Sequence, residues 1–177
     1  MNQIMTASEY AVLGERNTLL FTRNLPAGVD TVWLWLTEAN LRRQWLADGD
    51  MELTKGAEFE LVWRNEQLSQ PADQIGRASE NEHSMTSTII DIEPGRSVSF
   101  TWSNTDGVTF ALYGKADETE LKVVHKALPD HATLLNIAAG WHAHLDILAS
   151  RLRGEKPVPF WDAWRHFKSD YEQRFAL

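Results

Sequence analysis

His125, His142 and His144 are the side chains best suited to chemistry, because a histidine changes its charge near neutral pH. His125 ends an alternating run and shares the parity of Leu121 and Val123, so we expect its ring to point inward. An inward imidazole can orient a ligand or act as an acid or base. A lone histidine without an identified partner is not a catalytic unit, so a structural histidine held by one hydrogen bond at the sheet rim is the competing interpretation.

The His142–Ala143–His144 spacing does not predict a metal site. Residues two apart lie about 200° apart around a helix, so the two imidazoles cannot face one ion. His142 and Asp146 are four apart and share a face, but two ligands do not make a site. The spacing and the glutamate of the HExxH motif are also missing. We therefore expect both histidines at solvated or rim positions, and we predict no metal.

Common catalytic templates are absent from the sequence. There are no cysteines, which excludes disulfides, a thiol nucleophile and cysteine-ligated metals. There is no GxGxxG, GxxxxGK[ST] or GxSxG motif, so no cofactor is predicted. Only Tyr113 and Arg23 could join His125 in an enzyme site, and Tyr113 has the parity of the outer face.

The charge balance excludes one class of partner. The 177 residues carry 17 Lys and Arg against 25 Asp and Glu, a net charge of −8, which argues against nucleic-acid binding. No apolar run approaches the ~20 residues of a membrane span. The opening residues lack a basic start followed by a long apolar stretch, so we expect a cytoplasmic protein.

The chain alternates with a period of two over much of its length, which is typical of antiparallel strands with one buried face. A β-type run covers residues 16–24, and two short helices follow over 29–46, split near Thr37, which we expect to cap the second. Residues 65–83 are polar and aperiodic, and we expect a mobile loop there. The inward residues expected in the later strands are Phe59, Leu61 and Trp63; Thr88, Ile90 and Ile92; Val98, Phe100 and Trp102; Val108, Phe110 and Leu112; and Leu121, Val123 and His125.

Two amphipathic helices end the sequence. Apolar residues recur at helical spacing from Ala138 to Leu152, after Pro129-Asp130 and before Gly154, a natural C-cap. The tail helix has an apolar stripe, and we favour packing on its own domain over packing on a partner; the stripe is Trp161, Trp164, Phe167, Tyr171 and Phe175. We predict a loosely held N-terminal arm over 1–15, a domain over 16–154 and a helical extension over 155–177. The expected fold is α+β, a curved antiparallel sheet of six or seven strands wrapped around the long helix.

The order of these expected elements, together with four short sequence segments, resembles the helix-grip superfamily of START-like and birch-pollen-allergen-like (SRPBCC) domains. They are the strand-to-helix opening from Arg23 to Thr37, LRRQWL at 41–46, the hairpin from Glu93 to Trp102, and His125 followed by Gly140-Trp141 and the leucines at 145, 148 and 152. They most resemble the branch named for the activator of heat-shock-protein-90 ATPase. The sequence departs from the family in its Pro26-Ala27 order and in its long, polar loop at 65–83.

The resemblance implies a cavity between sheet and helix that takes a hydrophobic or amphipathic small molecule, with His125 setting its orientation. The competing interpretation is that the aromatic rings simply fill the centre. A cavity enzyme of cyclase, dehydratase or hydrolase type, a chaperone-activating partner and a homodimer are the alternatives that the resemblance leaves open. The residues expected to line the cavity are Trp33, Trp45, Phe59, Leu61, Trp63, Ile90, Phe100, Trp102, Phe110, Leu112, Val123, His125, Trp141, Leu145 and Leu148.

Overall fold

The computed structural model describes residues 9–177; residues 1–8 of the expected arm lie outside the described residues. No helix within the described part of the chain is long and apolar enough to cross a membrane. The elements are β1 (Val12–Leu13), β2 (Leu19–Leu25), α1 (Val29–Thr37), α2 (Ala39–Arg42), β3 (Glu58–Trp63), β4 (His83–Glu93), β5 (Ser97–Phe100), β6 (Val108–Lys115), β7 (Glu118–His125), α3 (His131–Leu152) and α4 (Phe160–Arg174), with short 3₁₀ turns between some of them.

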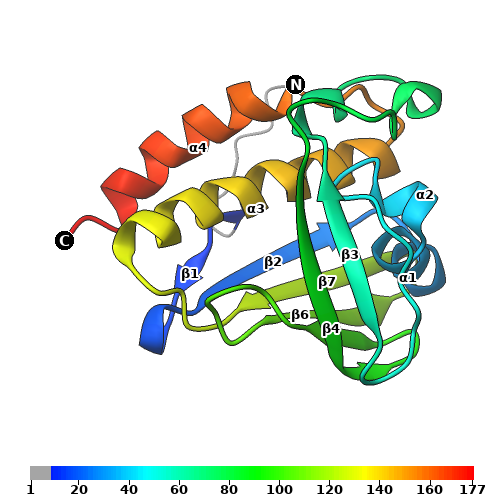
Figure 1. The fold of residues 1–177 in the computed structure, drawn as a ribbon, viewed down its shortest axis with the longest axis horizontal. Helices are drawn as coiled ribbons and strands as arrows, with labels where there is room; N and C mark the ends of the chain where they lie inside the picture. The colour runs from blue at the N-terminus through cyan, green and yellow to red at the C-terminus, as the bar shows by residue number, and fades with distance from the viewer. Residues whose placement is uncertain (1–8) are drawn as a thin grey trace.

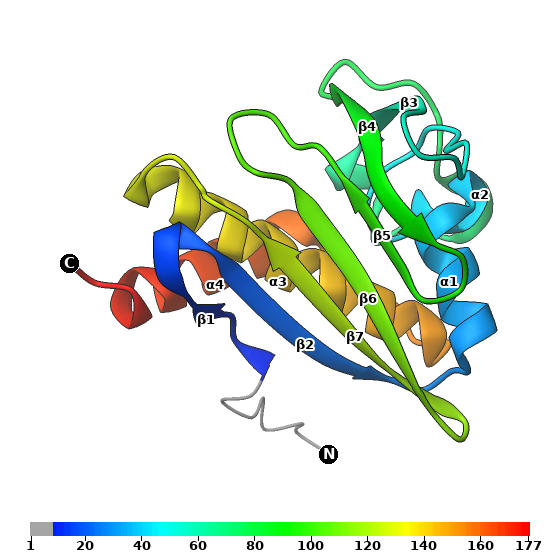
Figure 2. The same cartoon turned by 90° about the horizontal axis from the view of Figure 1, so that it is seen from below.

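The strands form one antiparallel sheet in the order β1-β2-β7-β6-β5-β4-β3. Figure 1 shows α3 lying over the sheet, with α4 on the other side of α3. Figure 2, seen from below, shows the long central strands crossing beneath that helix pair. The predicted α+β fold is confirmed, with a curved sheet of seven strands around a long C-terminal helix.

The ends of α3 follow directly from its sequence. The Asp130 side chain accepts a hydrogen bond from the Thr133 N–H at 2.7 Å, which caps the first turn. Gly154 follows the helix with φ of +71°, a conformation that glycine adopts without the steric penalty of a Cβ. Both predicted ends are therefore confirmed. The 22-residue helix is buried on most of its circumference, which requires cover on the side away from the sheet.

Helix α4 supplies that cover, and the prediction that the tail packs on its own domain is confirmed. Phe160, Phe167 and Tyr171 are buried against α3. The predicted stripe is wrong at one end, because Trp161 is 44% exposed and Phe160 takes the buried position.

The parity expected for β4 is wrong at Thr88 and Ile90, because Ser87 and Ile89 take the buried positions. The register shifts between Ile89 and Asp91, and this bulge turns Ile89 into the core, where it is 1% exposed. Ile90 is 43% exposed, on the face of the sheet away from the core. A bulge adds one residue to a strand and leaves no mark in the amino-acid composition. A strict two-residue alternation therefore assigned Ile90 to the wrong face.

Residues 9–13 are held against the domain, in contrast to the loosely held arm expected there. Val12 and Leu13 pair with β2, and Ala11 is 7% exposed. The Tyr10 hydroxyl donates to Asp170 of α4 at 2.6 Å. Residues 10–13 are therefore docked between β2 and α4.

The segment over residues 65–83 is also ordered against the core, in contrast to the mobile loop expected. Leu68 and Ile75, its only large apolar residues, are 1% and 6% exposed. The Gln67 side chain accepts from the Gly76 N–H and donates to the Arg77 carbonyl, which closes the loop on itself. Arg151 of α3 donates to the carbonyl oxygens of Leu68 and Gln70, each at 2.8 Å.

Buried Arg42 organises the turn after α1. Its guanidinium donates to the carbonyl oxygens of Leu36, Thr37 and Gly49, and the side chain is 0% exposed. Burial lowers the pKa of Arg42 to about 10, which leaves it charged at neutral pH. Thr37 is not the cap of α2, because its hydroxyl instead donates to the Trp33 carbonyl and Glu38 holds the cap position.

The segment after α2 runs beside β3 and contacts it closely at Gly49. Asp48 and Val62 form an isolated bridge, and Gly49 has φ of +117°. A Cβ at Gly49 would lie 1.8 Å from the Glu60 carbonyl oxygen, so the close approach of the two backbones excludes any side chain.

We predict that Gly49→Ala lowers the free energy of unfolding by at least about 3 kcal/mol, since it combines backbone strain with a clash against backbone. Gly56→Ala is the matched control, because Gly56 also has positive φ, +88°, but a Cβ there meets nothing within 4 Å. That control should lose only about 1–2 kcal/mol. Urea unfolding of both variants measures the difference, and equal losses would contradict the close approach.

Candidate functional site

The predicted cavity residues form the hydrophobic core, and their rings contact one another. The Phe100 ring centroid lies 5.7 Å from that of Phe59 and 5.5 Å from that of Phe110. Trp141 lies 5.8 Å from Phe110 and 5.6 Å from Trp102. These edge-on and tilted contacts fill the space between the middle of the sheet and α3. The buried members of the predicted set are Trp45, Phe59, Leu61, Trp63, Phe100, Phe110, Leu112, Val123, His125, Trp141, Leu145 and Leu148; Trp33 and Trp102 are half-buried against them.

A pocket of about 310 Å³ remains at one end of the core, between β3, β4, α3 and the start of α4. We call it the aromatic pocket, because five of the eight tryptophans line it. Its volume lies at the lower end of the range of small-molecule sites. The lining residues are Leu46, Trp63, Asn65, His83, Met85, Trp102, Asn136, Ile137, Gly140, Trp141, His144, Phe160, Trp161 and Trp164.

Only Trp63, Trp102 and Trp141 of the predicted cavity residues reach this pocket. Sequence reasoning missed the remaining walls because the strand pattern does not determine the positions of α4 and residue 65, or which residues of β4 and α3 face them. One signal was available in the sequence. Gly140 lies near the middle of a helix, where glycine is unfavourable by roughly 0.5–1 kcal/mol relative to alanine, and this marks a place where a side chain is not wanted.

His125 points inward as predicted, but it lies behind the pocket wall. Its Nδ1 accepts from the Trp141 indole N–H at 3.0 Å, so the proton is on Nε2, which lies 3.2 Å from the Thr105 hydroxyl. Burial lowers its pKa to about 4, which keeps the ring neutral. With both nitrogens engaged, His125 fixes the orientation of Trp141 and does not contact the pocket directly.

His142 and His144 are buried, in contrast to the solvated or rim positions expected. They lie on opposite flanks of α3 as predicted, and α4 crosses over both: His142 stacks on Phe167 at 3.7 Å between ring centroids, and His144 packs on Phe160 at 4.5 Å. His144 Nδ1 donates to the Trp45 carbonyl at 2.8 Å, which leaves Nε2 as an acceptor. Burial lowers the pKa of His144 to about 4.

The residues considered for an enzyme site do not converge. Tyr113 is 50% exposed on the outer face of β6. Arg23 and His125 both face inward, but Arg23 pairs with Leu121 whereas His125 pairs with Leu19, four residues away along β2. Four residues of extended strand separate them by about 13 Å, beyond hydrogen-bond reach.

The buried, neutral state of His125 predicts a loss of stability in acid. The unfolded chain binds a proton near pH 6.5 and the folded protein only near pH 4, so the contribution is complete above pH 6.5 and is lost as the pH falls toward 4. Between pH 7 and pH 5 this amounts to about 2 kcal/mol. His125→Gln keeps a donor and an acceptor but cannot titrate, so urea unfolding at both pH values should show a loss smaller by that amount. An equal loss of stability in both proteins would contradict the contribution assigned to His125.

Comparisons with known proteins place this geometry in a family. A protein from Bordetella parapertussis, solved in solution, is 33% identical, with a TM-score of 0.72 over 89% of this chain and 85% of that chain. CalU16 from Micromonospora echinospora is 19% identical, with a TM-score of 0.65 over 95% of this chain and 96% of that chain.

DynU16, a protein of the dynemicin biosynthetic locus, is 21% identical, with a TM-score of 0.60 over 79% of this chain and 48% of that chain. Among curated proteins none matches significantly. The model of the family described as activator of Hsp90 ATPase homolog 1-like protein matches residues 26–153, from the turn after β2 to the end of α3. The chain therefore belongs to the family of activator of Hsp90 ATPase homolog 1-like proteins.

Proposed function

We propose that the protein binds a hydrophobic or amphipathic small molecule, with an aromatic ring system, in the aromatic pocket. Tryptophan faces and edges offer a large, rigid apolar contact area to a flat ligand. Binding is driven by burial of apolar surface, and a ligand that buries about 200 Å² would gain about 5 kcal/mol at 25 cal/mol per Å², before the entropy of association is subtracted.

The observation that carries the proposal is Gly140. A Cβ at this position would meet nothing within 4 Å, so packing within the domain does not require a glycine. Gly140 nevertheless lines the pocket from near the centre of α3, where an alanine would favour the helix. The bare backbone leaves space that the protein's own side chains do not use, as expected for a site kept open for a ligand.

Polar groups in the wall favour an amphipathic ligand over a pure hydrocarbon. The Asn65 side-chain oxygen is buried and has no hydrogen-bond partner within residues 9–177. His144 is held so that its Nε2 is an acceptor. Two acceptors beside an apolar wall suit a ligand with a hydroxyl or amine donor, which would satisfy an oxygen that is otherwise unfavourably buried.

The comparisons support a small-molecule role at the level of the family. DynU16 belongs to a biosynthetic locus, but at 21% identity the likeness to it shows the fold alone. The homodimer, the chaperone partner and the cytoplasmic location expected from the sequence stay predictions. No catalytic role is proposed, because the three polar residues considered for one lie on different faces or far apart.

Filling the pocket from Gly140 tests the proposal. We expect 8-anilinonaphthalene-1-sulfonate and a hydroxylated anthraquinone to quench the tryptophan fluorescence of the native protein saturably. Gly140→Phe should weaken this binding at least tenfold, because the new ring occupies the pocket. Gly140→Ala is the matched control and should keep most of the affinity while gaining roughly 0.5–1 kcal/mol of stability.

The melting temperature separates a filled pocket from a damaged fold. Gly140→Phe should melt at or above the temperature of the unmodified protein, since the space is open and any residue other than proline favours a helix over glycine. Binding that is absent in the unmodified protein, or unchanged in a folded Gly140→Phe variant, would refute the proposal.

A further inference from the structure

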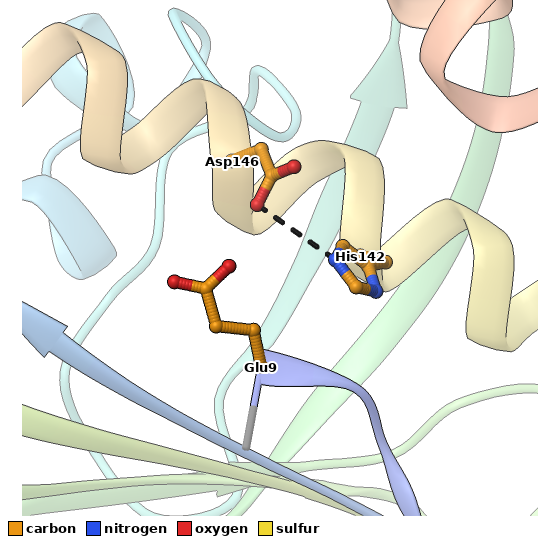
Figure 3. Close-up of side chains that lie close together, drawn as sticks. All are labelled: Glu9, His142 and Asp146. Carbon is orange, nitrogen blue, oxygen red and sulfur yellow. Dashed lines mark ion pairs between the residues drawn. The ribbon is translucent and has the colours of Figure 1, made fainter. Parts of the chain in front are cut away.

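A second cavity, of about 530 Å³, lies on the opposite flank of α3, between β2, α3 and α4. We call it the polar cavity. Glu9 and Asp146 are among its lining residues, and His142 lies next to them, as Figure 3 shows. One ligand atom from each of these three side chains lies within 4.8 Å of the other two. The three residues come from the N-terminal segment and from successive turns of α3, and together we call them the His–carboxylate cluster.

His142 presents an unpartnered nitrogen to this cluster. The side chain is 0% exposed, and its Nε2 has no hydrogen-bond partner among the described residues. The Asp146 Oδ1 atom lies 4.0 Å from this nitrogen, which is too far for a hydrogen bond. A buried polar nitrogen without a hydrogen-bond partner is unfavourable. A ligand that binds Nε2 and the two carboxylates at once would remove this cost.

The other nitrogen of His142 is held in a way that suits metal ligation. Nδ1 lies 2.8 Å from the Tyr171 phenolic oxygen, and this oxygen also accepts the Ala11 N–H at 2.9 Å. When Nδ1–H donates to Tyr171, Nε2 carries its lone pair toward the carboxylates. A metal-bound histidine is usually fixed by such a second hydrogen bond.

Arg23 holds the cluster in place without occupying the space between its side chains. Its Nη1 donates to the backbone carbonyl of Glu9, which holds that residue beside α3. Its Nη2 lies 3.7 Å from Asp146 Oδ1, beyond hydrogen-bond distance, so the carboxylate stays available to a cation. The guanidinium also reduces the repulsion between Glu9 and Asp146 in the absence of a metal.

We propose that Glu9, His142 and Asp146 form a binding site for one divalent first-row transition metal, with Zn²⁺ as the reference ion. One imidazole nitrogen with two carboxylate oxygens is a ligand set that such ions accept. Bonds of about 2.0–2.1 Å place tetrahedral ligand atoms about 3.4 Å apart, so the side chains would close by roughly an ångström. Glu9 and Asp146 line the polar cavity, which would give the ion and a water molecule access to the site.

The sequence did not predict this site because the third ligand is remote. His142 and Asp146 share one face of a helix, and two ligands alone did not justify a site. Glu9 joins them only because residues 9–13 dock beside β2 and under α4. The site is independent of the proposed function, because none of its three residues lines the aromatic pocket.

Isothermal titration of the full chain, freed of metal with EDTA, tests the proposal. We expect one Zn²⁺ per chain, and a rise in melting temperature on saturation. Glu9→Gln and Asp146→Asn should each weaken binding at least tenfold. Asp162→Asn is the matched control, because Asp162 lines the same cavity outside the cluster, and it should leave the affinity unchanged. In nitrogen-detected NMR, the His142 Nε2 signal should shift on Zn²⁺ addition.

Exposed His166 and half-buried Asp170 on α4 form the competing Zn²⁺ binder, with Nε2 and the carboxylate oxygen 3.5 Å apart. His166→Gln distinguishes the two sites. Binding that survives His166→Gln and is lost in folded Glu9→Gln supports the cluster. Binding that survives Glu9→Gln and is lost in His166→Gln, or the absence of stoichiometric binding, overturns the proposal.

Discussion

The structure depends on the burial of α3 from two sides. A helix that lies on a sheet normally exposes a polar stripe, but here buried residues occupy most of the circumference, from Leu134 to Leu148. The curved sheet covers one side and α4 covers the other, as Figure 1 shows. Without α4, two neutral histidines and a tryptophan wall would meet water. The tail helix is therefore part of the domain's core, although the family model ends at residue 153.

The same constraint explains where open space is found. Aromatic rings in contact with one another fill the centre between the sheet and α3, and the two cavities described above lie along the two flanks, where α4 packs beside α3. One flank is rich in tryptophan, and the other is lined mainly by charged and polar residues. Two chemically different cavities thus share one helix, and the identity of a residue on α3 depends on which flank it faces: Gly140 and His144 on one side, Asp146 on the other.

Much of the fold could be predicted from the sequence, because it follows from local periodicity. Val98 and Phe100, like Leu121 and Val123, alternate with polar residues, and this alternation predicted the buried faces of their strands. Asp130 and Gly154 marked the ends of α3. The prediction was wrong where one extra residue shifted the alternation of a strand, as at the bulge that exposes Ile90, because a bulge has no periodic signature.

The sites were harder to predict than the fold, because they depend on contacts between segments far apart in the chain. The loop over 65–83 was expected to be mobile from its polarity, yet Leu68 and hydrogen bonds from Arg151 hold it against the core. His144 lines a pocket only because Phe160 covers it. Helical spacing placed the histidines on the correct flanks, but the spacing does not reveal what packs over each flank.

The contact of residues 10 and 11 with α4 has a consequence for biosynthesis. The Tyr171 hydroxyl accepts the Ala11 N–H, and Asp170 accepts from Tyr10, each across 160 residues of sequence. Closing so long a loop is entropically unfavourable until the intervening sheet has formed. During translation, residues 10 and 11 are made long before α4 and cannot form these two contacts until α4 has been made. The Ala11 N–H and the Tyr10 hydroxyl therefore stay without their native partners through most of the synthesis of the domain, and the last turns of α4 complete both contacts at once.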